Sequence, residues 1–102
     1  MAFDAEKIKR LRTIGHQLKP IVTIGEQGLS AGVKTELERA LDDHELIKIK
    51  FASNDRETRQ AVLDSVLLAS RAELIQQIGK VALICRVAKT TNKKLSNLHR
   101  IV

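Results

Sequence analysis

Hydrophobic and polar residues repeat along this chain with two different periods, and the switches between them predict the order of helices and strands. Apolar residues recur every three or four positions over 8–18, which predicts an amphipathic helix that begins after Asp4 and runs to about Gln17. Pro20 cannot continue a helix, so the apolar run "PIVTI" at 20–24 is predicted to be a strand.

The helical period returns after Ser30, whose side chain can cap a second helix. The buried face of that helix is expected to consist of Val33, Leu37, Ala40 and Leu41. In the following run "LIKIKF", at 46–51, apolar residues alternate with Lys48 and Lys50. This period of two predicts a strand that has one face in water.

Capping signatures predict two further helices. Asn54, followed by Glu57, is typical of the start of a third helix that buries Val62, Val66 and Ala69. The same signature at Ser70 predicts a short extra helix, "AELIQQI", over 72–78, which Gly79 would end.

The rest of the chain is predicted to be extended. The apolar segment "KVALICRVA", at 80–88, is expected to be the third strand, "KTTNKK" at 89–94 a basic loop, and "LSNLHRIV" at 95–102 a fourth strand. The predicted order is α-β-α-β-α-β-β within a single domain spanning 1–102, and the predicted class is a two-layer α/β fold with a four-stranded sheet.

This order brings distant basic residues to one edge of the sheet, if the first three strands are parallel. Strand–helix–strand crossovers connect parallel strands, and ligands usually bind where such strands end. The segments that follow the three strands would then share an edge, and the first helix would fold back to it. The basic residues expected there are Lys7, Lys9, Arg10, Arg56, Arg59, Arg86, Lys89, Lys93 and Lys94. Each of them taken alone is better explained as an ordinary solvated surface group.

Charge and composition narrow the classes of partner. The net charge is +6 and only 2% of residues are aromatic, with no Trp or Tyr. A basic protein without exposed aromatics suits the backbone of a polyanion better than stacked bases. One cysteine, Cys85, excludes an internal disulfide, and neither a membrane span nor a signal peptide is indicated, so a cytoplasmic location is expected.

The stretch "IGEQGLS" places Gly25, Glu26, Gln27 and Gly28 between the first strand and the second helix. Glycines there let peptide N–H groups approach a phosphate, next to the positive end of a helix dipole. Thr23 stands where a dinucleotide fingerprint needs glycine, and no P-loop string occurs. A GxxG loop of the kind that holds nucleic-acid backbone therefore remains possible, as does plain turn chemistry.

Four separated motifs occur in family order: "HQLKPIVTIGEQGLSAGV", "ALDDHELIKIKF", "DRETR" and "IGKVALICR". They resemble the CRM domain, the chloroplast RNA splicing and ribosome maturation family, and most closely its bacterial single-domain YhbY-type branch. The resemblance implies a fold similar to the C-terminal domain of bacterial translation initiation factor three, with a mixed sheet of order 1-2-4-3 whose last strand is antiparallel. It also implies RNA binding through the glycine loop and association with precursors of the large ribosomal subunit; plant relatives act in intron splicing.

Matched by position, Lys19 and Pro20 correspond to the family's "LKP", residues 25–28 to its loop, and 44–48 to its "HELIK". Glu26 is a departure, because family loops often carry lysine or a neutral residue there. Its carboxylate is expected to repel a phosphate unless the side chain turns away or caps a backbone amide.

We therefore expect a monomeric, non-catalytic protein that binds ribosomal RNA backbone and assists assembly of the large subunit. No cofactor or metal site is expected, because the three histidines show no ligand spacing and no catalytic pairing stands out. Two alternatives stay open. One is a protein-interaction module on ribosomal particles without direct RNA affinity, and the other is a small phosphoester-binding enzyme.

Overall fold

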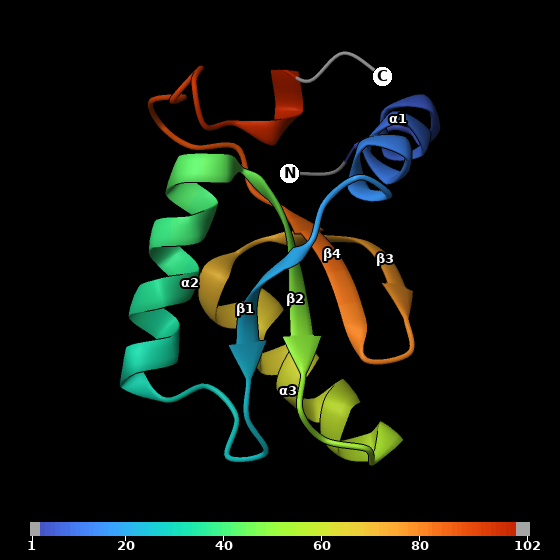
Figure 1. Cartoon of the computed structure of the whole chain (residues 1–102), viewed down its shortest axis with the longest axis vertical. Helices are drawn as coiled ribbons and strands as arrows, with labels where there is room; N and C mark the ends of the chain where they lie inside the picture. The colour runs from blue at the N-terminus through green and yellow to red at the C-terminus, as the bar shows by residue number, and fades with distance from the viewer. Residues whose placement is uncertain (1–2, 100–102) are drawn as a thin grey trace.

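The computed structural model describes residues 3–99, which form a four-stranded sheet with helices on both faces (Figure 1). The elements, in chain order, are α1 (Ala5–Gly15), β1 (Pro20–Ile24), α2 (Ala31–His44), β2 (Leu46–Phe51), α3 (Arg56–Ser70), β3 (Glu73–Ile78), β4 (Val81–Cys85) and a short 3-10 helix, η1 (Asn97–His99). No helix within the described part of the chain has the length and apolar character needed to cross a membrane.

The sheet has the order β1-β2-β4-β3. β1 and β2 are parallel, whereas β4 lies antiparallel to both β2 and β3. The expected α/β class and the mixed sheet of order 1-2-4-3 with an antiparallel last strand are therefore confirmed. The predicted strand at 80–88 is confirmed as β4, but the other strand beyond β2 is segment 73–78 and not the predicted segment 95–102.

Segment 72–78 is a strand and not a helix, which is the largest error of the pattern analysis. Its apolar residues mimic a helical period, but β3 pairs with β4 around a tight turn at Gly79, whose φ is 56°. The hydroxyl of Ser70 does not cap a new helix. It donates to the carbonyl of Val66 (2.6 Å) and accepts from the amide of Ala72 (3.2 Å), so that it closes the end of α3.

The predicted fourth strand is also wrong as far as it is described. Its first residues form a turn, in which the amide of Ser96 donates to the carbonyl of Asn92 (2.8 Å), and η1 follows. The side chain of Asn97 donates to the carbonyl of Leu46 (2.7 Å), so side chains and not a strand ladder hold this segment. Residues 100–102 of the predicted strand lie outside the described residues.

The predicted helix starts are mostly confirmed. Asp4 caps α1 by accepting from the amide of Lys7 (2.8 Å), and Ser30 caps α2 by accepting from the amide of Val33 (3.3 Å). The third helix is capped by Asp55 and not by Asn54, because the Asp55 carboxylate accepts from the amide of Thr58 (3.0 Å).

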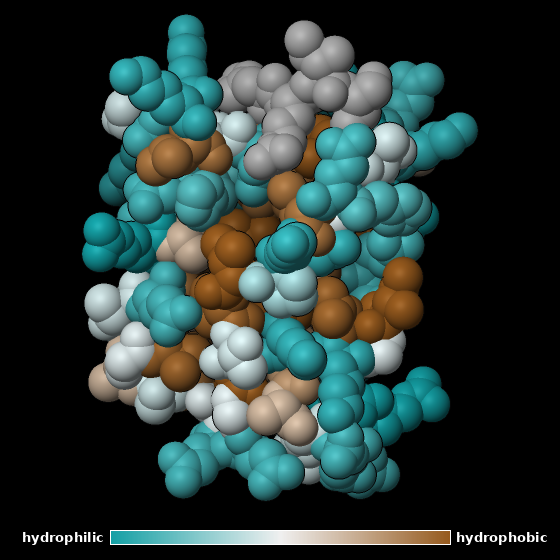
Figure 2. Space-filling view, in the orientation of Figure 1, coloured by the Kyte–Doolittle hydropathy of each residue, from teal (hydrophilic) through white to brown (hydrophobic). Residues whose placement is uncertain are grey.

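Two hydrophobic clusters hold the layers together. The larger one lies between the sheet and the helices α2 and α3, with Phe51, Leu41 and Leu63 fully buried at its centre. The smaller one lies on the opposite face, where α1 packs through Leu11 and Ile14. α1 covers only one end of this second face, so Lys50 and Ile78 on the remaining part are exposed. Figure 2 shows hydrophobic and hydrophilic surface side by side around the middle of the molecule.

Candidate nucleic-acid interface

The glycine loop, residues 25–28, is a tight turn between β1 and α2. The amide of Gly28 donates to the carbonyl of Gly25 (3.0 Å), and the amide of Ser30 donates to the carbonyl of Gly28 (3.0 Å). Gly28 has a φ of 81°, a left-handed conformation that only glycine adopts without strain. Gly28 is therefore explained by the turn itself.

Gly25 has no such internal explanation. A β-carbon built on it would meet no atom within 4 Å, and its φ is not positive. Glu26 and Gln27 beside it are exposed, and the first turn of α2 holds no acidic side chain that would neutralise the helix dipole. The loop thus presents open backbone next to a positive helix end, although the exposed Glu26 carboxylate shares this surface.

The turn between β2 and α3 lies at the same end of the sheet as the glycine loop (Figure 1). Arg59 braces this turn, because its guanidinium donates to the carbonyls of Ser53 (3.3 Å) and Asn54 (2.8 Å). Hydrogen bonds from the Thr58 side chain and amide hold the pKa of Asp55 below its ordinary value, so this carboxylate stays charged. Arg56 is exposed at the first position of α3. We call this region, with the glycine loop, the loop end.

Most of the predicted cations lie at the other end of the molecule, which corrects the expectation of a common edge. β4 is antiparallel to β2, so the segment that follows β4 leaves the sheet where β1 and β2 begin. α1 packs at the same place, against β2, β3 and η1. We call this region the basic end; its predicted site residues are Lys7, Lys9, Arg10, Lys19, Lys89, Lys93 and Lys94.

The two ends lie at opposite extremes of a molecule that is 35 Å long (Figure 1). Among residues 3–99, no ion pair engages the cations of the basic end, although Lys7 lies over the ring of Phe3, with Nζ 4.8 Å from its centre. Asp4 and Glu6 share the surface of α1 with Lys7. At the loop end, by contrast, Arg59 is occupied by backbone carbonyls.

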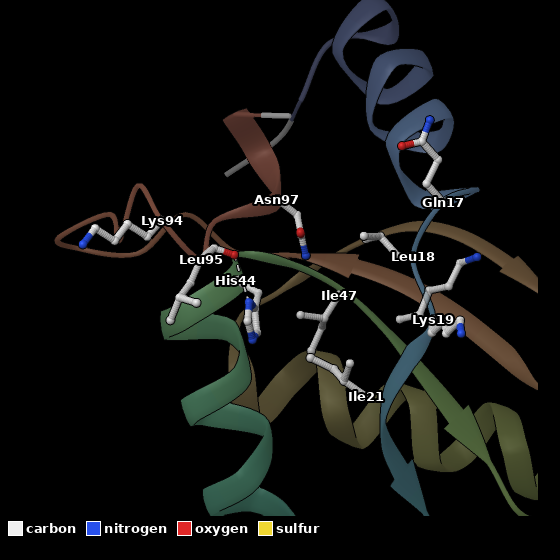
Figure 3. Close-up of a pocket in the computed structure, with 10 residues that line it drawn as sticks. Gln17, Leu18, Lys19, Ile21, His44, Ile47, Lys94, Leu95 and Asn97 are labelled. Atoms are coloured by element: carbon white, nitrogen blue, oxygen red, sulfur yellow. Dashed lines mark hydrogen bonds between the residues drawn. The ribbon is translucent and has the colours of Figure 1, made fainter. Parts of the chain in front are cut away.

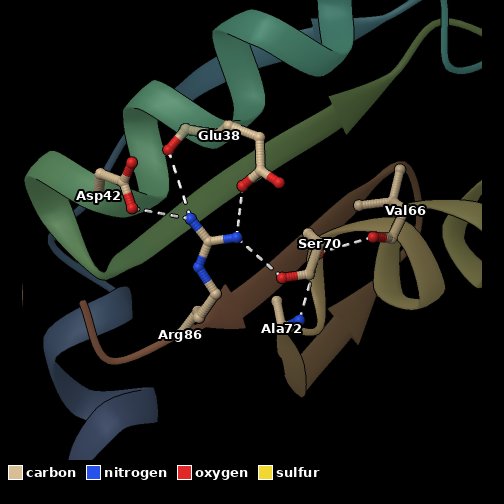
Figure 4. A network of polar contacts seen from close by, with 6 residues as sticks. All are labelled: Glu38, Asp42, Val66, Ser70, Ala72 and Arg86. Atoms are coloured by element: carbon tan, nitrogen blue, oxygen red, sulfur yellow. Dashed lines mark hydrogen bonds and ion pairs between the residues drawn. The ribbon is translucent and has the colours of Figure 1, made fainter. Parts of the chain in front are cut away.

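Arg86 belongs to neither surface, because its guanidinium ties three elements together (Figure 4). It forms ion pairs with Glu38 and with Asp42 (3.0 Å), both on α2, and donates to the carbonyl of Ser70 (2.8 Å) at the end of α3. Its side chain is only 21% exposed. The structure therefore gives Arg86 a bracing position between β4 and the two helices, away from the open rim that the sequence predicted.

Glu45 organises the basic end, although it is not among the site residues predicted from the sequence. Its side chain is completely buried, and its carboxylate accepts from the amide of Ala88 (2.6 Å) and the hydroxyl of Ser96 (2.6 Å). Its φ is 62°, which is unusual for a residue with a side chain. Glu45 thus fastens residues 86–97, which we call the strap and which carry the basic loop. The only signal was its place in "HELIK", because an isolated acid after a helix otherwise suggests a surface residue.

Comparison with known protein families identifies the family of this chain. The model of the CRS1/YhbY (CRM) domain matches residues 4–86. The chain belongs to the CRM domain family. A protein of Pseudomonas aeruginosa, named as a probable RNA-binding protein, is 50% identical over 100 residues, which cover 98% of this chain and 96% of the relative.

Other CRM relatives extend this comparison. An RNA-binding protein of Haemophilus influenzae is 38% identical, with 83% of this chain and 86% of the relative covered. The solution structure of a hypothetical Staphylococcus aureus protein, described as a candidate RNA-binding protein, superposes with a TM-score of 0.75 at 28% identity, covering 92% of this chain and 97% of that one. The fold expected from the resemblance is therefore found in a solved structure.

Proposed function

We propose that this protein is a single-domain, non-catalytic RNA-binding protein that associates in the cytoplasm with precursors of the large ribosomal subunit. It would hold one folded segment of ribosomal RNA by its backbone while assembly proceeds. Membership of the CRM family supports an RNA partner, since the named relatives are RNA-binding proteins. The ribosomal target follows from the family resemblance alone.

The observation that carries the proposal is the set of uncompensated cations at the basic end. They come from α1, from the approach to β1 and from the strap, and within residues 3–99 none has an acidic partner in an ion pair. Holding like charges together without partners costs electrostatic energy, which a polyanion would relieve. The glycine loop offers a second contact through backbone amides, so RNA would be held at two places and not along one rim.

The salt dependence of binding tests this proposal. If three to five phosphates are neutralised, the logarithm of the affinity for ribosomal RNA should fall with the logarithm of salt concentration with a slope of about −2 to −4. Fluorescence anisotropy with fragments of large-subunit RNA measures the slope. An affinity for RNA that does not change with salt would overturn the electrostatic mechanism, and crosslinking in cells followed by sequencing would identify the RNA that is bound.

One feature favours the alternative of a protein-interaction module. Leu68 on α3 is 84% exposed and borders a hollow beside the glycine loop that also includes Leu29 and Val62. Such a surface suits an apolar protein contact. Retention of the protein on ribosomal particles in high salt, together with no affinity for naked RNA, would favour this function, whereas release by salt favours RNA binding.

A further inference from the structure

The basic end holds a pocket of about 310 Å³ between the approach to β1, the end of α2 and the strap (Figure 3). Its floor is aliphatic and includes Ile21 on β1 and Ile47 on β2, while Leu95 of the strap forms one side. Ile21 is 46% exposed and Leu95 is 43% exposed, so both present apolar surface to whatever enters. The volume is at the lower limit of pockets that hold small ligands or parts of larger ones.

Lysines from three separate segments line this pocket. Lys19 precedes β1, Lys48 lies on β2, and Lys94 belongs to the strap. No acidic side chain lines the pocket, which distinguishes it from the hollow around Arg86 that Glu38 and Asp42 line. We call it the lysine pocket. Its charge favours an anion, and its floor favours an apolar face.

The walls of the lysine pocket are held in place by hydrogen bonds. The ring of His44 contacts the carbonyl of Leu95 through Nδ1 (2.9 Å), and because a carbonyl can only accept, Nδ1 carries the proton. Asn97 is fixed by its bond to the carbonyl of Leu46, and the strap that carries Leu95 is fastened by Glu45. A ligand would therefore meet preformed walls and would not have to order them.

We infer that the lysine pocket binds one unpaired nucleotide of the bound RNA. The aliphatic floor would receive the face of the base, while the ammonium groups of Lys19, Lys48 and Lys94 would neutralise the phosphates on either side. A base that packs its face against aliphatic side chains needs no aromatic residue. This agrees with the 2% aromatic content of the chain, which leaves no aromatic surface for base stacking. This inference rests on the proposed RNA-binding function and gives it a preference for single-stranded segments.

A charge-matched pair of double variants tests the contribution of the lysines. Lys19→Ala combined with Lys94→Ala removes two charges from the pocket, and Arg39→Ala combined with Lys80→Ala removes two charges elsewhere. With a fluorescein-labelled single-stranded RNA of ten nucleotides, the pocket variant should make the log–log salt slope shallower by about 1.4, at 0.7 for each lost phosphate contact on a single strand. The control pair should leave the slope close to that of the unaltered protein, and thermal melting should show that both variants are folded.

A second variant asks whether the base itself is bound. Ile21→Ala shortens the aliphatic floor without changing charge. It should weaken binding of the ten-nucleotide RNA several-fold but leave binding of an abasic strand of the same length unchanged. The same result for both strands, whether an equal loss or no loss, would show that the floor does not contact the base and would overturn the inference.

The remaining outcomes separate this inference from the proposed function. If the unaltered protein binds neither single-stranded nor structured RNA, the proposed function fails and the pocket inference fails with it. If the protein binds RNA but the pocket variant matches the control pair, only the pocket inference fails. If an acidic peptide such as oligoglutamate binds as tightly as RNA, with the same dependence on Lys19 and Lys94, the pocket is a docking site for protein and the inference is overturned.

Discussion

The loop end and the basic end carry positive charge in different ways. At the loop end the cation Arg59 is bound by backbone carbonyls, and the charged carboxylate of Asp55 lies in the same turn. Its remaining attraction for an anion comes from the exposed side chain of Arg56 and from peptide groups at the start of α2. At the basic end the cations are long, exposed side chains, and Lys89 and Lys93 are examples. The loop end thus offers mainly fixed peptide dipoles, and the basic end offers flexible charged side chains.

Because of this difference, RNA binding at the two ends should be weakened by different kinds of substitution. Fixed dipoles require a backbone that can be approached closely, so their contribution depends on the absence of side chains at the glycine loop. Mobile charges depend little on shape and strongly on salt. The basic end also needs its strap to be fastened, and this makes it vulnerable to a residue that touches no ligand.

The largest expected effect is on stability, from Glu45→Ala. The substitution leaves the half-buried amide of Ala88 and the buried hydroxyl of Ser96 without their acceptor, which should lower the free energy of unfolding by about 3 kcal/mol. For a domain of this size the melting temperature should then fall by roughly 15 °C. Hydrogen exchange should show faster exchange at 88–96 while the glycine loop stays unchanged. Glu36→Ala, an exposed acid of α2, is the control, and an unchanged melting temperature for both variants would show that the strap is not held by Glu45.

The next largest effect is expected from Arg86→Ala. Loss of the guanidinium removes hydrogen bonds to Glu38, Asp42 and the carbonyl of Ser70, and should cost about 2 kcal/mol. Thermal melting measures this loss, with the exposed Arg39→Ala as the matched control. RNA affinity, measured at a temperature where the variant is folded, should change less than that of the lysine variants. A strong loss of affinity with little loss of stability would return Arg86 to the RNA surface.

Lys89→Ala combined with Lys93→Ala should affect binding and not folding. Both residues are exposed on the strap, so the free energy of unfolding should stay within about 0.5 kcal/mol of its original value. The affinity for structured ribosomal RNA should fall about tenfold at moderate salt, and the salt slope should become shallower by between 1 and 2. Anisotropy titrations over a range of salt concentrations test this, and an unaltered slope would remove the strap from the RNA contact.

The two glycines of the loop should separate turn chemistry from ligand contact. Gly28→Ala should cost about 1 kcal/mol, because alanine is strained at a φ of 81°. Gly25→Ala should leave stability nearly unchanged, since its β-carbon would enter open space. If RNA backbone lies against the loop, Gly25→Ala should still weaken RNA binding a few-fold. Unchanged affinity in this folded variant would take the glycine loop out of the mechanism.

The smallest effect is expected for thiol labelling of Cys85, which probes the packing under α1. Burial, together with the charge of Glu45, raises the pKa of the Cys85 thiol to about 12. The thiol should therefore stay protonated at pH 8, and a thiol reagent should react with it only as fast as the protein opens. Rapid labelling of the native protein at that pH would contradict the packing described for this cluster, and unfolding in denaturant is the positive control.

Much of the fold could be predicted because the local signals agreed with the tertiary structure. The caps at Asp4 and Ser30, the strand of 20–24 and the alternation of 46–51 all have one structural solution each. Segment 72–78 did not, because its apolar spacing fits a helix as well as a strand. Its secondary structure depends on pairing with β4, and this contact cannot be predicted from the local sequence pattern.

That one error explains why the predicted site was divided. With a helix at 72–78, the segment 80–88 would be a parallel strand that ends beside Gly25. With a hairpin it is antiparallel, and Lys93 is carried to the far end of the molecule. The basic residues themselves could be named from the sequence, whereas their grouping required the direction of a single strand. Glu45 could not be found, since its burial depends on side chains about fifty residues later.

The shortness of β1 sets the spacing between the two proposed RNA contacts, the lysine pocket and the glycine loop. Lys19 stands immediately before this strand and Gly25 immediately after it, and five extended residues measure roughly 16 Å. Parallel pairing with β2 holds this distance constant, so β1 fixes the separation between the lysine pocket and the glycine loop. A nucleic-acid strand that contacts both sites must span this fixed distance. RNA segments could therefore be distinguished by their length, independently of their base sequence.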